Sequence, residues 1–346
     1  MQNSLFSDEE LAPITPGAEA RQPSSISAVN AASHAPSLIE IANRLPAHLR
    51  LGGSTWSYPG WRGLVWDDED YSPSVLSRHG LTAYANHPLM RAVGVDRSFY
   101  RGMSVAEYEQ HANQVPGDFR FVVKGPASVC DAVLRDDQGR GEKPNPLFLN
   151  AEEASREFVL PAAEGLGDKL GVLCFQLSPL PLPLVVDMAA TIAHLDAMLG
   201  ALPDFRAKAP SAIIAVEVRD HEWLCPEFVA VLKRHRATYC LSGHPKMPVI
   251  DEQLPILRAL WPGPLVCRWL LNRKHGAYGQ GKADKAYAPY DRFFDEDEAT
   301  RHELAKLAAV FAKASQPVYI TVSNTAEGCA PMSVAALAKE IAARVD

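Results

Sequence analysis

The feature that most constrains the fold of this chain is the alternation of short apolar runs with helical or polar stretches. Several runs are too apolar for a strand with one exposed face, and strands covered on both faces are typical of a parallel sheet. The eight runs cover residues 49–54, 90–98, 119–125, 171–178, 211–220, 237–243, 264–271 and 317–324. Eight strands with intervening helices predict an α/β fold, a closed (β/α)8 TIM-type barrel, and an open doubly wound sheet is the alternative. No G-x-G-x-x-G follows the first run, which disfavours a dinucleotide site.

The length of the chain is compatible with one barrel domain. A chain of 346 residues could hold two domains, but α/β barrels reach this size as one. Residues 1–36 are rich in Ser, Ala, Pro and Gln and show no sustained hydrophobic period, so they predict a flexible N-terminal arm. Residues 37–346 are then a single domain. It opens with a short helix from Ser37, which Pro46 ends.

Charge and targeting signals indicate a soluble protein. The net charge of −7 argues against a protein held on nucleic acid by bulk positive charge. The N-terminal sequence lacks the basic and apolar regions of a signal peptide, and no stretch approaches the roughly 20 apolar residues of a membrane span. The six cysteines form no C-x-x-C pair, and Cys174, Cys240 and Cys267 stand in apolar runs typical of buried thiols. We therefore expect a cytoplasmic protein with no membrane partner.

Polar side chains stand at the carboxyl ends of the predicted strands, where the active site of a TIM barrel forms. In residues 211–220, the alternation puts Glu217 and Arg219 on one face and the neighbouring valines on the other. Further polar residues near the ends of the third, fourth, seventh and eighth strands are Lys124, Gln176, Arg268 and Asn324. Each has a structural alternative: a Glu–Arg pair, a backbone cap or a lysine that reaches solvent.

If these side chains converge, they form a site for an anion. Lys124, Arg219 and Arg268 would bind carboxylate or phosphate, and Glu217 would act as general acid or base. Asp96 is a second candidate carboxylate for acid–base work or for a metal.

Aromatic residues after the first and second strands could add to this site. Trp56, Tyr58, Trp61 and Trp66 follow the first strand, and they could either wall a pocket or cover the end of the barrel. Tyr100 shares a face with Asp96 and Ser98 in the second strand segment. Two long polar connections, residues 129–146 and 272–298, follow strand ends and would overhang the same rim.

No motif identifies a cofactor, and the metal evidence is weak. His221, His244 and His275 have no second histidine at ligand spacing. A nucleophile elbow, a P-loop and an H-E-x-x-H motif are all absent from the sequence. We predict no metal site, and the cofactor stays unassigned.

The strand-end strings together resemble the YecE-like family, domain of unknown function 72, from about Leu51 to the C-terminus. The strings are GGSTWSYPGW, the SFY at Ser98–Tyr100, FRFVVKGP, DKLGVLCFQLSP, VEVRDHEW and SNTAEGCAP. The resemblance implies a TIM-type barrel. It also implies a cleft at the strand carboxyl ends with contributions from Trp56, Tyr100, Lys124, Gln176, Glu217, Arg219, Arg268 and Asn324.

The chain departs from the family pattern at three places. The second-strand pattern V-E-I-N-S-T-F-Y reads VGVDRSFY, with Gly94 and Asp96 in the Glu and Asn positions. A histidine that is common in the family after the third strand is replaced near Asp131. Leu270 stands where the family commonly has a second histidine. These changes indicate a divergent branch and disfavour a histidine-dependent mechanism.

Three functions remain open from the sequence. The first is a hydrolase or lyase that acts on a small anionic or phosphorylated substrate. The second is metal-assisted phosphodiester chemistry on nucleic acid, which the acidic charge and missing ligand cluster disfavour. The third is a non-catalytic protein that uses the barrel mouth as a receptor.

Overall fold

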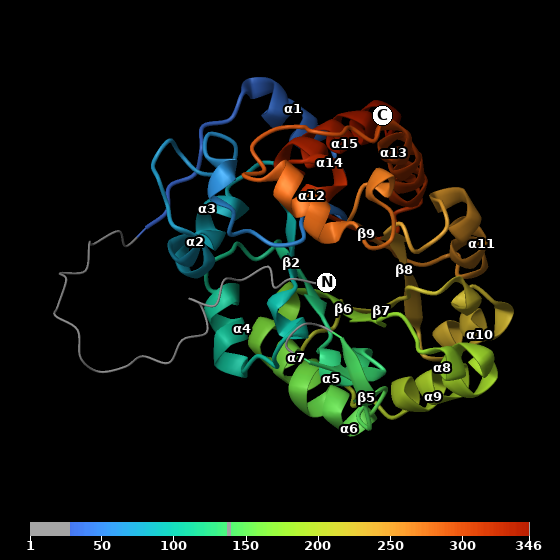
Figure 1. The fold of residues 1–346 in the computed structure, drawn as a ribbon. Coiled ribbons are helices and arrows are strands. Elements are labelled where there is room, and N and C mark those ends of the chain that lie inside the picture. The colour runs from blue at the N-terminus through green and yellow to red at the C-terminus, as the bar shows by residue number, and fades with distance from the viewer. Residues whose placement is uncertain (1–27, 137–139, 346) are drawn as a thin grey trace.

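The computed structural model describes residues 28–136 and 140–345, and its central feature is an eight-stranded parallel barrel. Helices surround the strands (Figure 1). In order around the barrel the strands are β1 (Leu49–Gly53), β2 (Ala92–Val95), β3 (Arg120–Lys124), β6 (Leu170–Gln176), β7 (Ile213–Glu217), β8 (Ala237–Gly243), β9 (Leu265–Trp269) and β10 (Val318–Val322). Seven lie within the predicted runs and β6 starts one residue before its run, so the TIM-type barrel is confirmed.

The helices occupy the connections between consecutive barrel strands and the two flanks of the domain. The first precedes β1, and the last packs beside it near the C-terminus (Figure 1). They are α1 (Pro36–Arg44), α2 (Pro73–His79), α3 (Leu81–Ala85), α4 (Val105–Ala112), α5 (Ala127–Cys130), α6 (Ala151–Ala154), α7 (Leu160–Leu166), α8 (Leu182–Val186), α9 (Met188–Gly200), α10 (Pro226–Arg234), α11 (Ile250–Ala259), α12 (Gln280–Tyr287), α13 (Glu298–Lys313), α14 (Asn324–Glu327) and α15 (Ala330–Val345).

Several helices begin at side chains that cap their first turn. Ser104 and Glu107 form a reciprocal capping box at the start of α4. Asp187 caps α9, and Asp297 caps α13. Each cap satisfies an amide that would otherwise lack a partner, so the sequence defines where these helices start.

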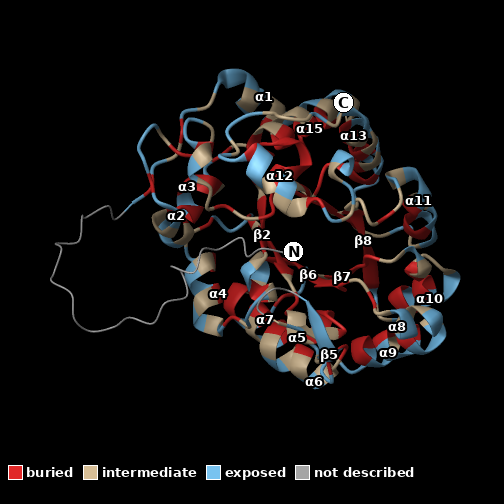
Figure 2. Cartoon of the chain, in the orientation of Figure 1, coloured by how far each residue is buried: buried red, intermediate tan, exposed pale blue. Residues whose placement is uncertain are grey.

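The strand period of two separates an outer face, packed on helices, from an inner face. Figure 2 shows the barrel strands as almost wholly buried. The inner face holds a cluster of mostly small residues: Ala92, Val122, Val172, Cys174, Ala215, Cys240, Val266 and Tyr319. Two positions further along most of these strands, toward their carboxyl ends, the same alternation reaches Lys124, Gln176, Glu217, Ser242, Arg268 and Thr321. A polar layer therefore lies directly above an apolar one.

The barrel closes where β1 approaches β2. A parallel bridge joins Leu51 to Met90, and it is the point of contact between the two ends of the sheet. The approach is so close that a Cβ on Gly52 would lie 1.8 Å from the carbonyl oxygen of Ala92. Only glycine fits this position.

A buried tyrosine replaces part of the strand ladder at this closure. The Tyr84 hydroxyl accepts a hydrogen bond from the Gly53 amide at 2.7 Å and donates one to the Ala92 carbonyl at 2.9 Å. Tyr84 has no exposed surface, so water cannot take over either bond. The hydroxyl therefore links β1 to β2 where direct pairing stops.

Two segments differ from the sequence prediction. The connection after β3 contains an antiparallel hairpin of β4 (Val133–Arg135) and β5 (Gly141–Pro144), where we predicted only a loop. The predicted arm is also too long, because residues 28–36 are part of the folded domain. The Ala32 amide donates to the Val65 carbonyl at 3.0 Å, and Val29 is buried. The rest of the predicted arm, residues 1–27, lies outside the described residues.

The thiols and the helices agree with two simpler expectations. All six cysteines are free, and Cys174, Cys240 and Cys267 are buried as predicted. Among the described helices, none combines the length and the apolar character that a membrane crossing requires.

We predict that Tyr84→Phe lowers the free energy of unfolding by about 1–3 kcal/mol, because a buried amide and a buried carbonyl lose their partner together. Urea denaturation followed by circular dichroism measures the change. Tyr278→Phe is the control, since Tyr278 is 87% exposed and should change stability little. Equal stability of wild type and Tyr84→Phe would show that the hydroxyl does not hold the closure.

Candidate functional site

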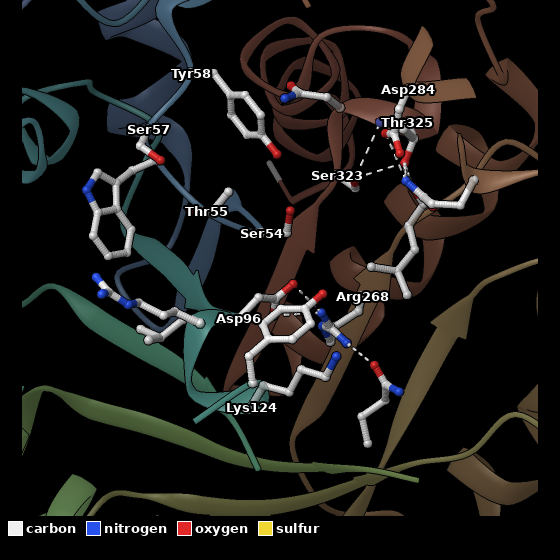
Figure 3. A pocket seen from close by; sticks show the side chains of 18 of the residues that line it. Ser54, Thr55, Ser57, Tyr58, Asp96, Lys124, Arg268, Asp284, Ser323 and Thr325 are labelled. Atoms are coloured by element: carbon white, nitrogen blue, oxygen red, sulfur yellow. Dashed lines mark hydrogen bonds and ion pairs between the residues drawn. The ribbon is translucent and has the colours of Figure 1, made fainter. Parts of the chain in front are cut away.

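A cavity of about 1030 Å³ opens at the carboxyl ends of the barrel strands (Figure 3). Segments that follow each of the eight barrel strands contribute to its walls. Eight of the nine predicted site residues line it: Trp56, Asp96, Tyr100, Lys124, Gln176, Arg219, Arg268 and Asn324. Glu217 is the exception, because it lies beneath the cavity floor with no exposed surface.

Arg268 is the hub of the cavity floor. Its Nη2 atom contacts both carboxylate oxygens of Asp96 at 2.8 and 2.9 Å. Its Nη1 atom donates to Glu217 Oε2 at 2.8 Å and to Gln176 Oε1 at 3.2 Å. The side chain starts from β9 and reaches groups on β6, β7 and the end of β2, so one guanidinium ties several sides of the barrel together.

Glu217 is held by a second arginine and by a serine that the sequence did not single out. Arg219 forms an ion pair with Glu217 Oε1, and Ser242 donates to the same oxygen at 3.0 Å. Arg219 Nη1 also lies 2.5 Å from the Ser242 hydroxyl. Glu217 and Arg219 therefore face the barrel interior, not the outer helices.

These contacts set the protonation of the network. Burial alone would raise the pKa of Glu217, but the charges of Arg219 and Arg268 outweigh it and hold the pKa at about 2. Burial would lower the pKa of Arg268, yet Asp96 and Glu217 raise it well above its ordinary value. Glu217 is thus ionised at neutral pH, and both of its oxygens are engaged. Its geometry suits fixing the arginines in place.

Lys124 differs from the arginines because it forms no ion pair with any described residue. It ends β3, and its Nζ atom lies 3.6 Å from the centre of the Phe99 ring. Burial lowers the pKa of Lys124 to about 8, with Asp96 acting in the opposite direction. Figure 3 shows its side chain extending into the cavity beside Arg268 and not out to solvent.

Asn324 and the tryptophans mostly build the wall. Asn324 Oδ1 accepts from Trp61 Nε1 at 3.1 Å and from the Ala330 amide at 2.9 Å, which fixes the segment after β1 against the start of α15. Trp61 and Trp66 stack with ring centres 6.2 Å apart and are fully buried. They cover the barrel end, whereas Trp56 reaches the cavity and packs edge-on against His111 at 5.2 Å.

Other lining residues come from loops whose roles the sequence left open. Asp284 and Tyr290 belong to the connection after β9, and the Tyr58 and Tyr290 rings meet at 5.2 Å across the rim. Arg97 lies one residue after Asp96, and Lys246 follows β8. The predicted overhang of the long connections pointed to Asp284 and Tyr290, and the aromatic cluster after the first strand pointed to Tyr58. No sequence signal pointed to Arg97 or Lys246.

The described residues offer one group with metal-ligand geometry, and its chemistry is unfavourable. The ligand atoms of Cys174, Glu217 and Cys240 lie within 4.8 Å of one another. Burial raises the pKa of the Cys240 thiol well above its ordinary value, and metal binding requires the thiolate. The Glu217 carboxylate is already neutralised by two arginines. Asp96 and Glu217 likewise have the Arg268 guanidinium between them.

The histidines do not complete a catalytic set. His244 lines the cavity, but burial lowers its pKa to about 3, so it is neutral at physiological pH. His221 does not line the cavity; its ring contacts Glu222.

Most of the chain matches the model of one protein family. The family model described as "Protein of unknown function DUF72" matches residues 50–346. The chain belongs to the DUF72 family. A search of curated proteins finds no match.

Two solved DUF72 structures share the fold. A DUF72 family protein from Enterococcus faecalis V583 is 17% identical, with a TM-score of 0.54 over 85% of this chain and 95% of that one. A DUF72 family protein from Thermotoga maritima MSB8 is 18% identical, with a TM-score of 0.52 over 85% of this chain and 98% of that one. At this sequence identity, the likeness supports the barrel fold and does not assign any site residue.

The closure of the barrel also restricts Gly94 in β2. A Cβ on Gly94 would lie 2.4 Å from the carbonyl oxygen of Ser54. The tight approach of β1 and β2 therefore leaves no room for a side chain at this position. Asp96, two residues further on, is the carboxylate of this segment that contacts Arg268.

We predict that Glu217→Gln lowers the free energy of unfolding by about 3–5 kcal/mol at pH 7, because two buried guanidinium groups lose their shared counter-charge. The depressed pKa of Glu217 stabilises the fold above its ordinary value of 4.5, and that stabilisation is lost as the pH falls toward 2. Urea denaturation of both proteins between pH 7 and pH 2.5 should show the difference shrinking below about pH 4.5. If the difference in unfolding free energy between the two proteins did not change with pH, the ionised state of Glu217 would not be its source.

Proposed function

We propose that this DUF72 protein is an enzyme of the hydrolase or lyase type that binds a small anionic substrate, phosphorylated or carboxylated, at the barrel mouth. The observation that carries the proposal is the charge of the cavity in a chain of net charge −7. Among the described residues that line it are two carboxylates, Asp96 and Asp284, and seven cations: Arg78, Arg97, Lys124, Arg135, Arg219, Lys246 and Arg268.

The cations divide into a paired and an unpaired group. Arg219 and Arg268 are committed to Glu217 and Asp96, and Arg135 pairs with Asp131. In contrast, four lining cations form no ion pair with any residue of the described chain, namely Arg78, Arg97, Lys124 and Lys246. We define these four as the open cations. Arg78 and Arg97 are exposed, and Lys124 and Lys246 are partly buried, so an anion in the cavity would meet cations that no carboxylate already neutralises.

This division changes which residues bind the anion. The sequence predicted that Lys124, Arg219 and Arg268 bind the anion, but the carboxylate partners of the two arginines already occupy much of their hydrogen-bonding capacity. The open cations are better placed, with Arg219 and Arg268 as the rigid base beneath them. Gln176 orients Arg268 from the side.

Acid–base groups also face the cavity, which supports an enzyme over a receptor. Asp96 is partly exposed to the cavity, and the Lys124 amine and the Tyr100 hydroxyl lie around the same space. A carboxylate and an amine that face a bound substrate can move protons in hydrolysis or elimination. Asp96 is thus the better placed proton carrier, since Glu217 is shielded from the cavity.

We predict that glycerol 3-phosphate raises the melting temperature by roughly 2–5 °C at saturation, because a ligand that binds only the native state stabilises it. The double variant Arg97→Gln/Lys124→Met should lose this shift. Lys339→Met is the matched control, since Lys339 is exposed on α15 and does not line the cavity.

The comparison ligands separate the competing functions. Glycerol should give no shift, because it lacks the anion. A shift with single-stranded DNA and none with glycerol 3-phosphate would favour nucleic-acid chemistry. If the double variant keeps the full shift, the open cations are not the anion site.

A further inference from the structure

The environment of Lys124 sets it apart from the other cations of the cavity. The Ser98 hydroxyl donates to the Lys124 carbonyl at 2.6 Å, which joins the turn after β2 to the end of β3. This bond also places Phe99 against the lysine, so the ring lies under the ammonium at 3.6 Å. The side chain therefore has a fixed direction and points into the cavity (Figure 3).

The charged groups around Lys124 do not neutralise it. The nearby carboxylates Asp96 and Glu217 are bound to Arg268, and Glu217 also to Arg219. Lys124 is left with an aromatic face instead of a counter-ion, in a partly buried position. A lysine in such a position loses its proton readily, so it can act as a cation beside an anion and also as a free amine.

The protonation of Lys124 agrees with this geometry. Burial lowers its pKa to about 8. A larger fraction of Lys124 than of an ordinary surface lysine is therefore unprotonated near neutral pH.

We propose that Lys124 is a nucleophile that forms a Schiff base with an aldehyde or ketone group of the substrate. The inference deepens the proposed function, and it rests on it for the substrate's anionic group. It defines the substrate as a small carbonyl compound with a phosphate or carboxylate. The reaction class becomes a lyase that breaks or forms a bond next to that carbonyl.

The chemical step balances with the groups present. The ammonium first gives one proton to Asp96, the partly exposed carboxylate that faces the same space. The Nζ lone pair forms a bond to the carbonyl carbon, the C=O π electrons move to oxygen, and an amine proton moves to that oxygen. Asp96 returns its proton as the C–O bond breaks and water leaves. A carbonyl compound and an ammonium thus give a protonated imine and water, with no other reactant.

The imine can be trapped and located. The full chain is incubated at pH 7.5 with glycolaldehyde phosphate or with glycolaldehyde, sodium cyanoborohydride reduces any imine, and peptide mass spectrometry measures the label at each lysine. We expect at least about tenfold more label on Lys124 than on Lys339 with both probes, because more of its amine is unprotonated. The phosphorylated probe should label Lys124 at lower concentration than the neutral one.

Two variants keep the test independent of folding. Lys124→Arg preserves the charge but cannot form an imine, so the rest of its labelling pattern should match wild type. Circular dichroism checks that this variant is folded. Arg97→Gln keeps the nucleophile and should reduce the advantage of glycolaldehyde phosphate over glycolaldehyde.

The outcomes separate this inference from the proposed function. Label on Lys124 equal to that on Lys339 with both probes overturns the nucleophile, whatever the melting shifts with glycerol 3-phosphate show. Strong label on Lys124 with both probes at equal concentrations supports the nucleophile and contradicts the anion site. Strong label with a preference for the phosphorylated probe supports both.

Discussion

The mouth of this barrel depends on one buried arginine. Arg268 is 4% exposed, and removal of its charge from water is compensated only by the contacts with Asp96, Glu217 and Gln176. Because those partners come from different strands, neutralising the charge of Arg268 also requires a particular arrangement of the strands. The strand ends must stand where the guanidinium can reach them. The polar layer thus fixes the shape of the cavity floor.

This constraint determines which residues are available for chemistry. Glu217 is ionised and covered, so its role is to hold Arg219 and Arg268. Asp96 shares Arg268 but remains partly exposed to the cavity. Lys124 has no counter-ion among the described residues, and burial shifts its protonation toward the neutral form. A structural network and a reactive amine therefore lie side by side in one layer.

Most of the fold could be predicted from the sequence, because parallel strands covered on both faces appear as separate apolar runs. The β4–β5 hairpin could not, since residues such as Gly141 and Pro144 are exposed and leave no alternating pattern. The boundary at residue 36 was wrong because burial of Val29 depends on tertiary packing.

The sequence predicted which residues line the cavity but not what each of them does there. Strand alternation brings Lys124, Gln176, Arg219 and Arg268 to one cavity. Which cation pairs with which carboxylate depends on side-chain reach across the barrel, and no sequence pattern encodes it. Ser242 shows the same limit, because its contact with Glu217 joins neighbouring strands 25 residues apart.

The most direct test of this account is a crystal structure of the protein grown with tungstate, whose anomalous signal locates a phosphate-like anion without ambiguity. We predict an anion inside the cavity with Lys124 Nζ and at least one more of the open cations within hydrogen-bond distance, and an undisturbed Arg268–Asp96 pair. Tungstate found only outside the cavity, or bound by an Arg268 that has left Asp96, would contradict the account.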